Sequence, residues 1–330
     1  MRRASLTSTG RYFPERVVSN DHFYGELQLD TNEEWIRSRT GIHTRHFADA
    51  SKGETTSGMC VRAAQQCLDR RGIAATDLDG IIVATITPDQ TLPSTACFVQ
   101  DALGATGAWA FDLVAACSGY VYALAQATSM VRTGMADRVL VIGAETMSSI
   151  LDFTDRNTCI IFGDGAGATL VEASDDGLEI VDFRMHSAGD GADLLMIPAG
   201  GASQPASAAT VAQNLHFVKQ DGRAVFKHAV TRISQVIVEL LEGHGLTADD
   251  VDIVVPHQAN IRIIEACGRK LKIPMDRIAV TVDQWANTTA ATIPTTLDWC
   301  LEQGRIPESG TVVLATFGAG FTWGSALLRG

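Results

Sequence analysis

The sequence contains an internal repeat with a period of about 170 residues. Cys117 precedes Gly134 by 17 residues, and Asn287 precedes Gly304 by the same distance. Each half also holds a glycine-rich segment that leads into an apolar run, FGDGAGATLVEA in the first and FGAGFTWGSALLRG in the second. Solenoid repeats are much shorter, roughly 20–50 residues. The sequence therefore predicts two duplicated halves packed together. Their predicted extents are residues 1–172 and 173–330.

Strand and helix patterns alternate within each half. Continuous apolar, β-branched runs are typical of strands buried on both faces of a parallel sheet. Four such runs predict strands at 80–84, 138–143, 252–255 and 311–315. Periodic apolar positions predict helices at 56–71, 118–132, 223–241 and 288–301. A glycine follows each helical pattern, which is a common stop signal. The alternation predicts an α/β fold.

Charge and cysteine usage limit the classes of function. The chain has 26 Lys and Arg against 38 Asp and Glu, a net charge of −12. This balance disfavours binding to nucleic acid or to an anionic membrane. No run approaches the roughly 18 apolar residues of a membrane span. The seven cysteines form no C-x-x-C pair, so we expect reduced thiols in a cytoplasmic protein rather than a zinc site or a disulfide scaffold.

Cys117 is a candidate nucleophile. It follows an apolar run and precedes a helical pattern in AFDLVAACSGYVYALAQA. A cysteine at a strand-to-helix turn lies at a helix N-terminus, where the helix dipole favours the thiolate. Taken alone, a small buried core cysteine is the commoner outcome.

His257 and Asn287 extend this candidate site. His257 follows a predicted strand in VDIVVPHQANIRII, and ligands of α/β sheets bind beyond the carboxyl ends of strands. Asn287 precedes a predicted helix, where a simple N-cap is the plain alternative. In the duplication, however, Asn287 corresponds to Cys117. Two equivalent turns meeting near a twofold axis would bring the cysteine, the histidine and the asparagine together.

Six motifs in order along the whole chain carry a family resemblance: NEEWIRSRTGI, DLVAACSG, DFTDRNTCIIFGDGAGA, VPHQANIRII, WANTTAAT and FGAGFTWGSALLRG. They make the chain similar to β-ketoacyl-acyl carrier protein synthase III of the thiolase-like superfamily. The resemblance implies a five-layered αβαβα fold, a homodimer and a catalytic triad of Cys117, His257 and Asn287. It also implies decarboxylative condensation of an acyl-CoA primer with malonyl-acyl carrier protein, initiating fatty acid synthesis without a metal or redox cofactor.

The same resemblance assigns further residues. The backbone N–H groups of Cys117 and Ala319 would bind the oxyanion. Trp35 and Arg156 would sandwich the CoA adenine, Arg39 would contact a phosphate, and Asn260 would touch the pantetheine arm. Residues assigned to the acyl carrier protein are Gln258, Arg262, Arg269 and Lys270.

The segment from Gln258 to Lys272 supports carrier docking by charge as well. It holds four basic residues against one acidic residue, and Arg262 and Arg269 are seven apart, which places them on one helix face. A merely solvated helix face is the alternative. Leu92 falls where relatives that prefer acetyl primers often carry Phe in the acyl pocket, so we expect longer primers to be accepted.

Other functions remain open from the sequence alone. A same-fold acyltransferase of a specialised pathway could use longer primers or an oxygen or nitrogen nucleophile. A non-catalytic acyl-binding paralogue and a Cys-His-Asn hydrolase are the alternatives from other classes. GDGAG at 163–167 lacks the Gly-Lys-Ser/Thr ending of a phosphate loop, so we expect close backbone packing there. Residues 199–213 are small and polar, which predicts a flexible surface loop.

Overall fold

The computed structural model describes residues 2–330 as two sheet regions that join edge to edge. The join is short, because β1 and β8 pair only at Ser5–Glu179 and Leu6–Leu178. The strands, in their order across the sheet, are β11 (Ile253–Pro256), β12 (Thr311–Gly318), β13 (Thr322–Arg329), β8 (Leu178–Ser187), β1 (Ser5–Tyr12), β7 (Gly165–Glu172), β6 (Arg138–Glu145), β4 (Gly80–Ala84) and β5 (Trp109–Leu113).

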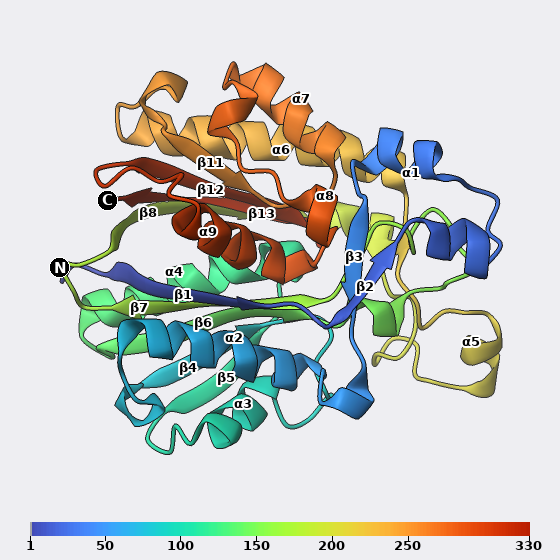
Figure 1. Ribbon diagram of the computed structural model, residues 1–330, viewed down its shortest axis with the longest axis horizontal. Helices are drawn as coiled ribbons and strands as arrows, with labels where there is room; N and C mark the ends of the chain where they lie inside the picture. The colour runs from blue at the N-terminus through green and yellow to red at the C-terminus, as the bar shows by residue number, and fades with distance from the viewer. Residues whose placement is uncertain (1) are drawn as a thin grey trace.

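The helices and the two sheet regions form five layers (Figure 1). Helices α6 and α7 cover β11–β13, helices α4 and α9 fill the space between the sheet regions, and α2 and α3 cover β4–β7. The αβαβα order predicted from the family resemblance is therefore confirmed. The helices of these layers are α2 (Thr56–Arg71), α3 (Thr95–Leu103), α4 (Gly119–Thr133), α6 (Gly222–Gly243), α7 (Ile261–Leu271) and α9 (Thr292–Glu302).

Strand pairing repeats between the two sheet regions. β4 and β6 pair in parallel, as do β11 and β12. β6 and β7 pair antiparallel, as do β12 and β13, and β1 and β8 then follow on the equivalent edges. The counterpart of β5 is reduced to one parallel bridge, Val254–Ile278. The topology thus repeats as the sequence predicted, while the division at residue 172 stays a prediction.

The predicted elements agree with the structure except at some ends. The four predicted strands correspond to β4, β6, β11 and β12, and α2 has the predicted limits. Gly243 does not stop α6, which includes it and is followed by Gly245 at φ +65°. The helix predicted from residue 288 begins as a 3₁₀ turn, Thr289–Ala291, before α9. Thr289, the first residue of this turn, has φ +55°.

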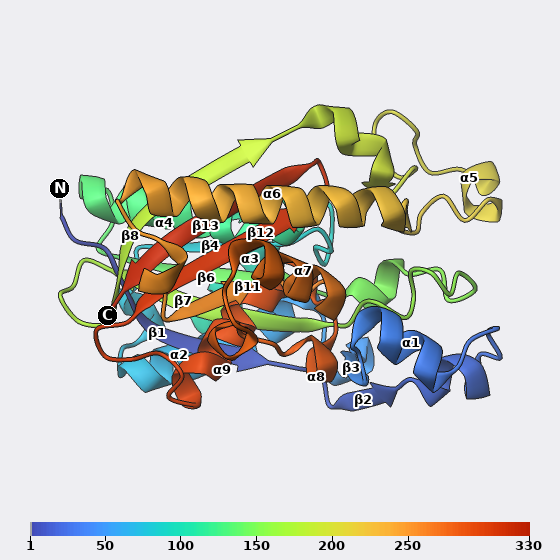
Figure 2. The same ribbon diagram turned by 90° about the horizontal axis from the view of Figure 1, so that it is seen from above.

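Smaller elements gather at one end of the layers, where Figures 1 and 2 place α1, β2, β3 and α5. Figure 2 also shows α6 running along β12 and β13 toward that end. Most residues of the predicted loop 199–213 are exposed, and α5 lies within it. These elements are β2 (Arg16–Ser19), β3 (Thr44–Phe47), β9 (Leu195–Met196), β10 (Lys219–Gln220), α1 (Glu33–Thr40), α5 (Ala208–Ala212) and α8 (Val282–Trp285).

The glycines of GDGAG allow close packing, as predicted. A Cβ at Gly167 would lie 2.8 Å from the backbone nitrogen of Thr295, and one at Gly163 would lie 2.9 Å from the carbonyl oxygen of Trp285. Over residues 2–330, no helix is both long enough and apolar enough to span a membrane.

Candidate active site

Cys117 lies in a tight turn between β5 and α4. The chain leaves β5, forms the 3₁₀ turn Ala116–Ser118, and enters α4 at Gly119. Ala116 has φ +47°, a conformation that costs a residue with a Cβ free energy. The strained turn places Cys117 directly before the helix, which confirms its predicted position.

The Cys117 turn packs on the opposite sheet region. The Thr316 hydroxyl, on β12, donates to the Cys117 carbonyl at 2.8 Å. A Cβ on Gly318 would lie 2.8 Å from the Cys117 nitrogen, so glycine is required for this approach. In return, the turn after Asn287 packs on β6, where a Cβ on Gly143 would lie 2.3 Å from the carbonyl oxygen of Ala290. This crossed packing brings the two turns face to face.

His257 lies just beyond the carboxyl end of β11. Its backbone N–H donates to the carbonyl of Ala315, at 2.8 Å, which extends the pairing with β12. The side chain is buried, and Nδ1 lies 2.6 Å from Oγ1 of Thr292. Burial lowers the pKa of the imidazole to about 3, so the ring is neutral at pH 7.

Asn287 occupies the turn equivalent to that of Cys117. Ala286 before it has φ +56°, as Ala116 has before Cys117. The backbone of Asn287 bridges Phe162, and its side-chain Oδ1 accepts the N–H of Thr289 at 2.8 Å. The side chain is therefore oriented like an N-cap, and Nδ2 is left as a hydrogen-bond donor.

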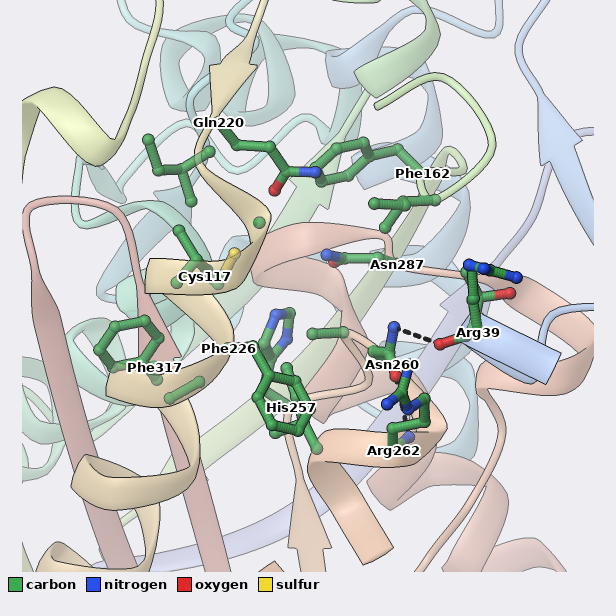
Figure 3. Close-up of a pocket in the computed structure, with 18 of the residues that line it drawn as sticks. Arg39, Cys117, Phe162, Gln220, Phe226, His257, Asn260, Arg262, Asn287 and Phe317 are labelled. Atoms are coloured by element: carbon green, nitrogen blue, oxygen red, sulfur yellow. Dashed lines mark hydrogen bonds between the residues drawn. The ribbon is translucent and has the colours of Figure 1, made fainter. Parts of the chain in front are cut away.

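Cys117, His257 and Asn287 line one cavity of about 900 Å³. Figure 3 shows the thiol, the imidazole and the amide converging inside it. An acyl group on the thiol would lie beside two neutral donors, an arrangement that can stabilise an oxyanion. The other predicted residues that line this cavity are Trp35, Arg39, Asn260 and Arg262.

The protonation state of Cys117 differs from the one predicted from the sequence. We expected the helix N-terminus to favour the thiolate, but burial raises the pKa of Cys117 above its ordinary value, and the Glu145 carboxylate acts in the same direction. Desolvation outweighs the helix dipole because the side chain is almost fully enclosed. In the free protein Cys117 is a thiol, and its proton must leave during acyl transfer.

An aromatic and basic cluster lies near the cavity mouth. The guanidinium groups of Arg39 and Arg156 lie 4.2 Å and 5.1 Å from the centre of the Trp35 ring. Arg156 also pairs with Asp30 at 3.0 Å. The predicted partners of an adenine therefore contact each other here, and a purine can enter between Trp35 and Arg156 only if Arg156 swings away.

Asn260 has a defined structural role at this mouth. Its Oδ1 caps α7 by accepting the N–H of Arg262 at 2.8 Å, and its Nδ2 donates to the carbonyl of Arg39 at 2.9 Å. The side chain thereby joins α7 to α1. Contact with a pantetheine arm stays a prediction.

The prediction that Gln258 binds the carrier protein is wrong. Its side chain is 1% exposed. Its Nε2 donates to the carbonyls of Pro256 and Ala279, and its Oε1 accepts the N–H groups of Thr281 and Val282. A buried amide with four internal hydrogen bonds cannot reach a docking protein, so Gln258 instead fixes the end of β11.

Besides Gln258 and Arg156, four predicted residues lie outside the cavity lining. Arg269 is exposed on α7 and faces Glu265 at 3.6 Å, whereas Lys270 borders a separate shallow hollow between α6 and α7. Leu92 is 82% exposed and does not line the cavity of its own chain. Ala319 follows Gly318, beside Cys117, where its carbonyl accepts the Thr322 hydroxyl at 3.1 Å.

Several cavity residues had no role in the sequence analysis. The aromatic wall comprises Phe162, Phe226 and Phe317, and Arg223 adds a cation from the start of α6. Two of these phenylalanines begin the glycine-rich segments, a signal that could have identified them. Within residues 2–330, no group of three or more His, Cys, Asp or Glu side chains is placed to hold a metal ion.

Comparison with known proteins agrees with this geometry. Profiles described as 3-oxoacyl-[acyl-carrier-protein (ACP)] synthase III and its C-terminal region match residues 111–189 and 241–330. The beta-ketoacyl-[acyl-carrier-protein] synthase III of Chlorobium luteolum is 48% identical over 328 residues, 99% of each chain.

Solved structures agree as well. The crystal structure of 3-oxoacyl-[acyl-carrier-protein] synthase III from Aquifex aeolicus is 40% identical, with a TM-score of 0.91 over 99% of this chain and 100% of that chain. The priming beta-ketosynthase from the R1128 polyketide biosynthetic pathway is 33% identical, with a TM-score of 0.89 over 99% and 96% of the two chains. On the cavity geometry and the full-length identity together, this chain belongs to the 3-oxoacyl-[acyl-carrier-protein] synthase III family.

Proposed function

We propose that this protein condenses an acyl-CoA primer with malonyl-acyl carrier protein through an acyl-Cys117 intermediate, and so initiates fatty acid synthesis. The observation that carries this proposal is the convergence of Cys117, His257 and Asn287 in one largely apolar cavity. A hydrolase would need water at the acyl thioester, which a largely apolar cavity disfavours. A non-catalytic paralogue would not need a cysteine, a histidine and an asparagine side chain in one cavity.

In the first half-reaction, Cys117 takes the acyl group. The sulfur of Cys117 attacks the thioester carbonyl, the C–S bond to CoA breaks, and the Cys117 proton leaves with the CoA thiol. The N–H groups of Cys117 and Ala319 are the proposed donors to the tetrahedral oxyanion.

In the second half-reaction, the malonyl thioester loses CO2. The electrons of the broken C–C bond form an enolate, whose oxygen accepts hydrogen bonds from Nε2 of His257 and Nδ2 of Asn287. The enolate carbon then forms a C–C bond to the acyl carbonyl, the thioester bond to Cys117 breaks, and the released thiolate takes a proton from solvent. The direct test supplies both substrates and measures CO2 and 3-oxoacyl-carrier product. Product without prior acylation of the protein would contradict the scheme.

A homodimer in the cytoplasm is part of the proposal. β5 is the last strand of the sheet, and Val114 directly after it is 75% exposed. Leu92 is a second exposed apolar side chain, on the segment that leads into α3. A second copy covering these residues would remove apolar surface from water and could receive Leu92 in its own acyl pocket. All seven cysteines are free thiols, which supports a reducing compartment.

We expect Arg262→Glu to lower kcat/KM for malonyl-acyl carrier protein about tenfold and to affect acyl-CoA much less. Arg262 lies at the first turn of α7, beside the cavity mouth, where charge reversal would slow association with an acidic partner. The measurement compares both substrates at two salt concentrations, because salt should mask the effect.

Arg2→Glu is the matched control for this charge reversal. Arg2 pairs with Asp137 and does not line the cavity. This variant should leave both substrates unaffected. Equal losses for the two substrates in Arg262→Glu would instead place Arg262 on the CoA path and refute a carrier-specific role.

We expect Leu92→Phe to move the preference among primers toward acetyl-CoA. If Leu92 closes the acyl pocket of a partner chain, the larger ring shortens that pocket, and each methylene is worth roughly tenfold in kcat/KM. The measurement is kcat/KM for acetyl-, butyryl- and hexanoyl-CoA in both proteins. Val211→Phe, at an exposed site on α5, is the control. A wild type that uses acetyl-CoA alone would contradict this prediction.

A second candidate is a priming ketosynthase of a specialised pathway. The similarity to the R1128 priming beta-ketosynthase favours it, because that protein shares the fold at 33% identity. The triad chemistry would be the same, and only the primer would differ. A strong preference for primers longer than butyryl-CoA would favour this candidate over fatty acid initiation.

A further inference from the structure

The hydrogen bond between His257 and Thr292 bears on which ring nitrogen carries the proton. The buried imidazole is neutral and holds a single N–H. Its Nδ1 contacts Oγ1 of Thr292 at 2.6 Å, which leaves Nε2 for the cavity. In a neutral histidine, the partner of one nitrogen decides whether the other is a donor or an acceptor. Thr292 is therefore placed to control the chemistry at Nε2.

The Thr292 hydroxyl has two acceptors within reach. One is Nδ1 of His257, and the other is the carbonyl of Thr289 at 3.0 Å. That carbonyl already accepts the backbone N–H of Thr292. If the hydroxyl donates to the Thr289 carbonyl, its oxygen accepts Nδ1–H of His257 and Nε2 becomes an acceptor. If it donates to Nδ1 instead, the single ring proton lies on Nε2.

The same segment also orients Asn287. The N–H of Thr289 donates to Oδ1 of Asn287, so the amide presents its NH₂ group to the cavity. Residues 287–292 thus leave a donor on Asn287, and an enolate oxygen between the two side chains would need a second donor on His257.

We propose that Thr292 is a positioning residue for the condensation step: its hydroxyl donates to Nδ1 of His257 and holds the ring proton on Nε2, toward the cavity. The proposal rests on the role given to His257 under the proposed function. Thr292 does not line the cavity, and in the proposed scheme the acyl transfer to Cys117 uses the N–H groups of Cys117 and Ala319 rather than Nε2.

The variant Thr292→Val removes the hydroxyl and keeps the shape of the side chain. We expect the condensation kcat to fall about 10-fold to 100-fold, the range of a buried unsatisfied acceptor, with acyl transfer within threefold of wild type and KM for malonyl-acyl carrier protein unchanged. Thr292→Ser restores the hydroxyl and should restore the rate. Thr295→Val is the matched control, because the Thr295 hydroxyl donates to the carbonyl of Ala291 and does not contact His257.

The tautomer itself is measured by NMR of the full-length protein labelled with ¹⁵N-histidine. His257→Ala identifies the signals of His257. We expect a protonated Nε2 and an unprotonated Nδ1 in the wild type, in Thr292→Ser and in Thr295→Val, and a loss of that preference in Thr292→Val. A protonated Nδ1 in the wild type would overturn the proposal, as would a normal condensation rate in a folded Thr292→Val.

The wild-type spectrum needs no variant and no substrate, so it tests the tautomer separately from catalysis. Normal decarboxylation by His257→Ala would overturn the proposed role of His257 and would leave the measured tautomer unaffected.

Discussion

Incubation with a preferred acyl-CoA is expected to add one acyl mass per chain, on the peptide that contains Cys117. Cys117→Ala should then remain unlabelled, and its condensation rate should fall on the order of 10⁴-fold or more, because the step that splits the reaction in two is lost. Intact-mass measurement with acyl-CoAs of graded length, followed by peptide mapping, reads out both the site and the preferred primer.

The other cysteines supply the controls for this experiment. Cys97 is the exposed one, so Cys97→Ser tests adventitious labelling without touching the cavity. Cys159 is buried next to Ile160, which lines the cavity. An acyl group on Cys97 or Cys159 instead of Cys117 would reject the mechanism.

His257→Ala and Asn287→Ala are expected to keep acyl transfer and to lose decarboxylation. Each variant removes one donor to the enolate oxygen, which is worth about 10²–10³ in rate. In the proposed scheme the acyl transfer uses the N–H groups of Cys117 and Ala319, so its rate should change little. Labelled acyl-CoA follows the first half-reaction, and CO2 release from malonyl-acyl carrier protein follows the second.

Matched variants sharpen this test. Asn287→Asp keeps the shape of the side chain but replaces the donor with an acceptor, so it should be at least as impaired as alanine. His257→Gln keeps an N–H group and should retain more decarboxylation than His257→Ala. Equal loss of both half-reactions in the alanine variants would reject the division of roles.

The sequence predicted strands that contain an uninterrupted run of aliphatic residues and did not predict β1, which contains none. β4 contains the buried run Ile81–Ala84, and β12 contains the buried run Val312–Ala315. β1, in contrast, lies at the centre of the sheet but reads SLTSTGRY, because its hydroxyl groups bond to other elements. Ser8 donates to the carbonyl of Cys67, and Thr9 donates to the carboxylate of Asp298. A strand whose polar groups are satisfied by tertiary contacts leaves no apolar run in the sequence.

The residues of the candidate active site were also predicted only where the sequence itself carries a signal. Cys117 and Asn287 were predicted because the repeat equates two positions, which is a property of the sequence. Gln258 was misassigned because its neighbours His257 and Asn260 face the cavity, while the direction of its own side chain depends on packing. Thr292 had no role in the sequence analysis, since its contact lies 35 residues away along the chain.

The crossed packing of the two active-site turns also makes catalytic activity depend on the folding of both halves of the chain. If β12 were not folded, the Cys117 turn would lack its contacts with Thr316 and Gly318. In a chain with only the second half folded, the segment after Asn287 would lack β6. The arrangement of Cys117, His257 and Asn287 in one cavity therefore depends on both turns being packed in place. We therefore expect an incompletely folded chain to be inactive toward thioesters, because the active site forms only when both turns are packed.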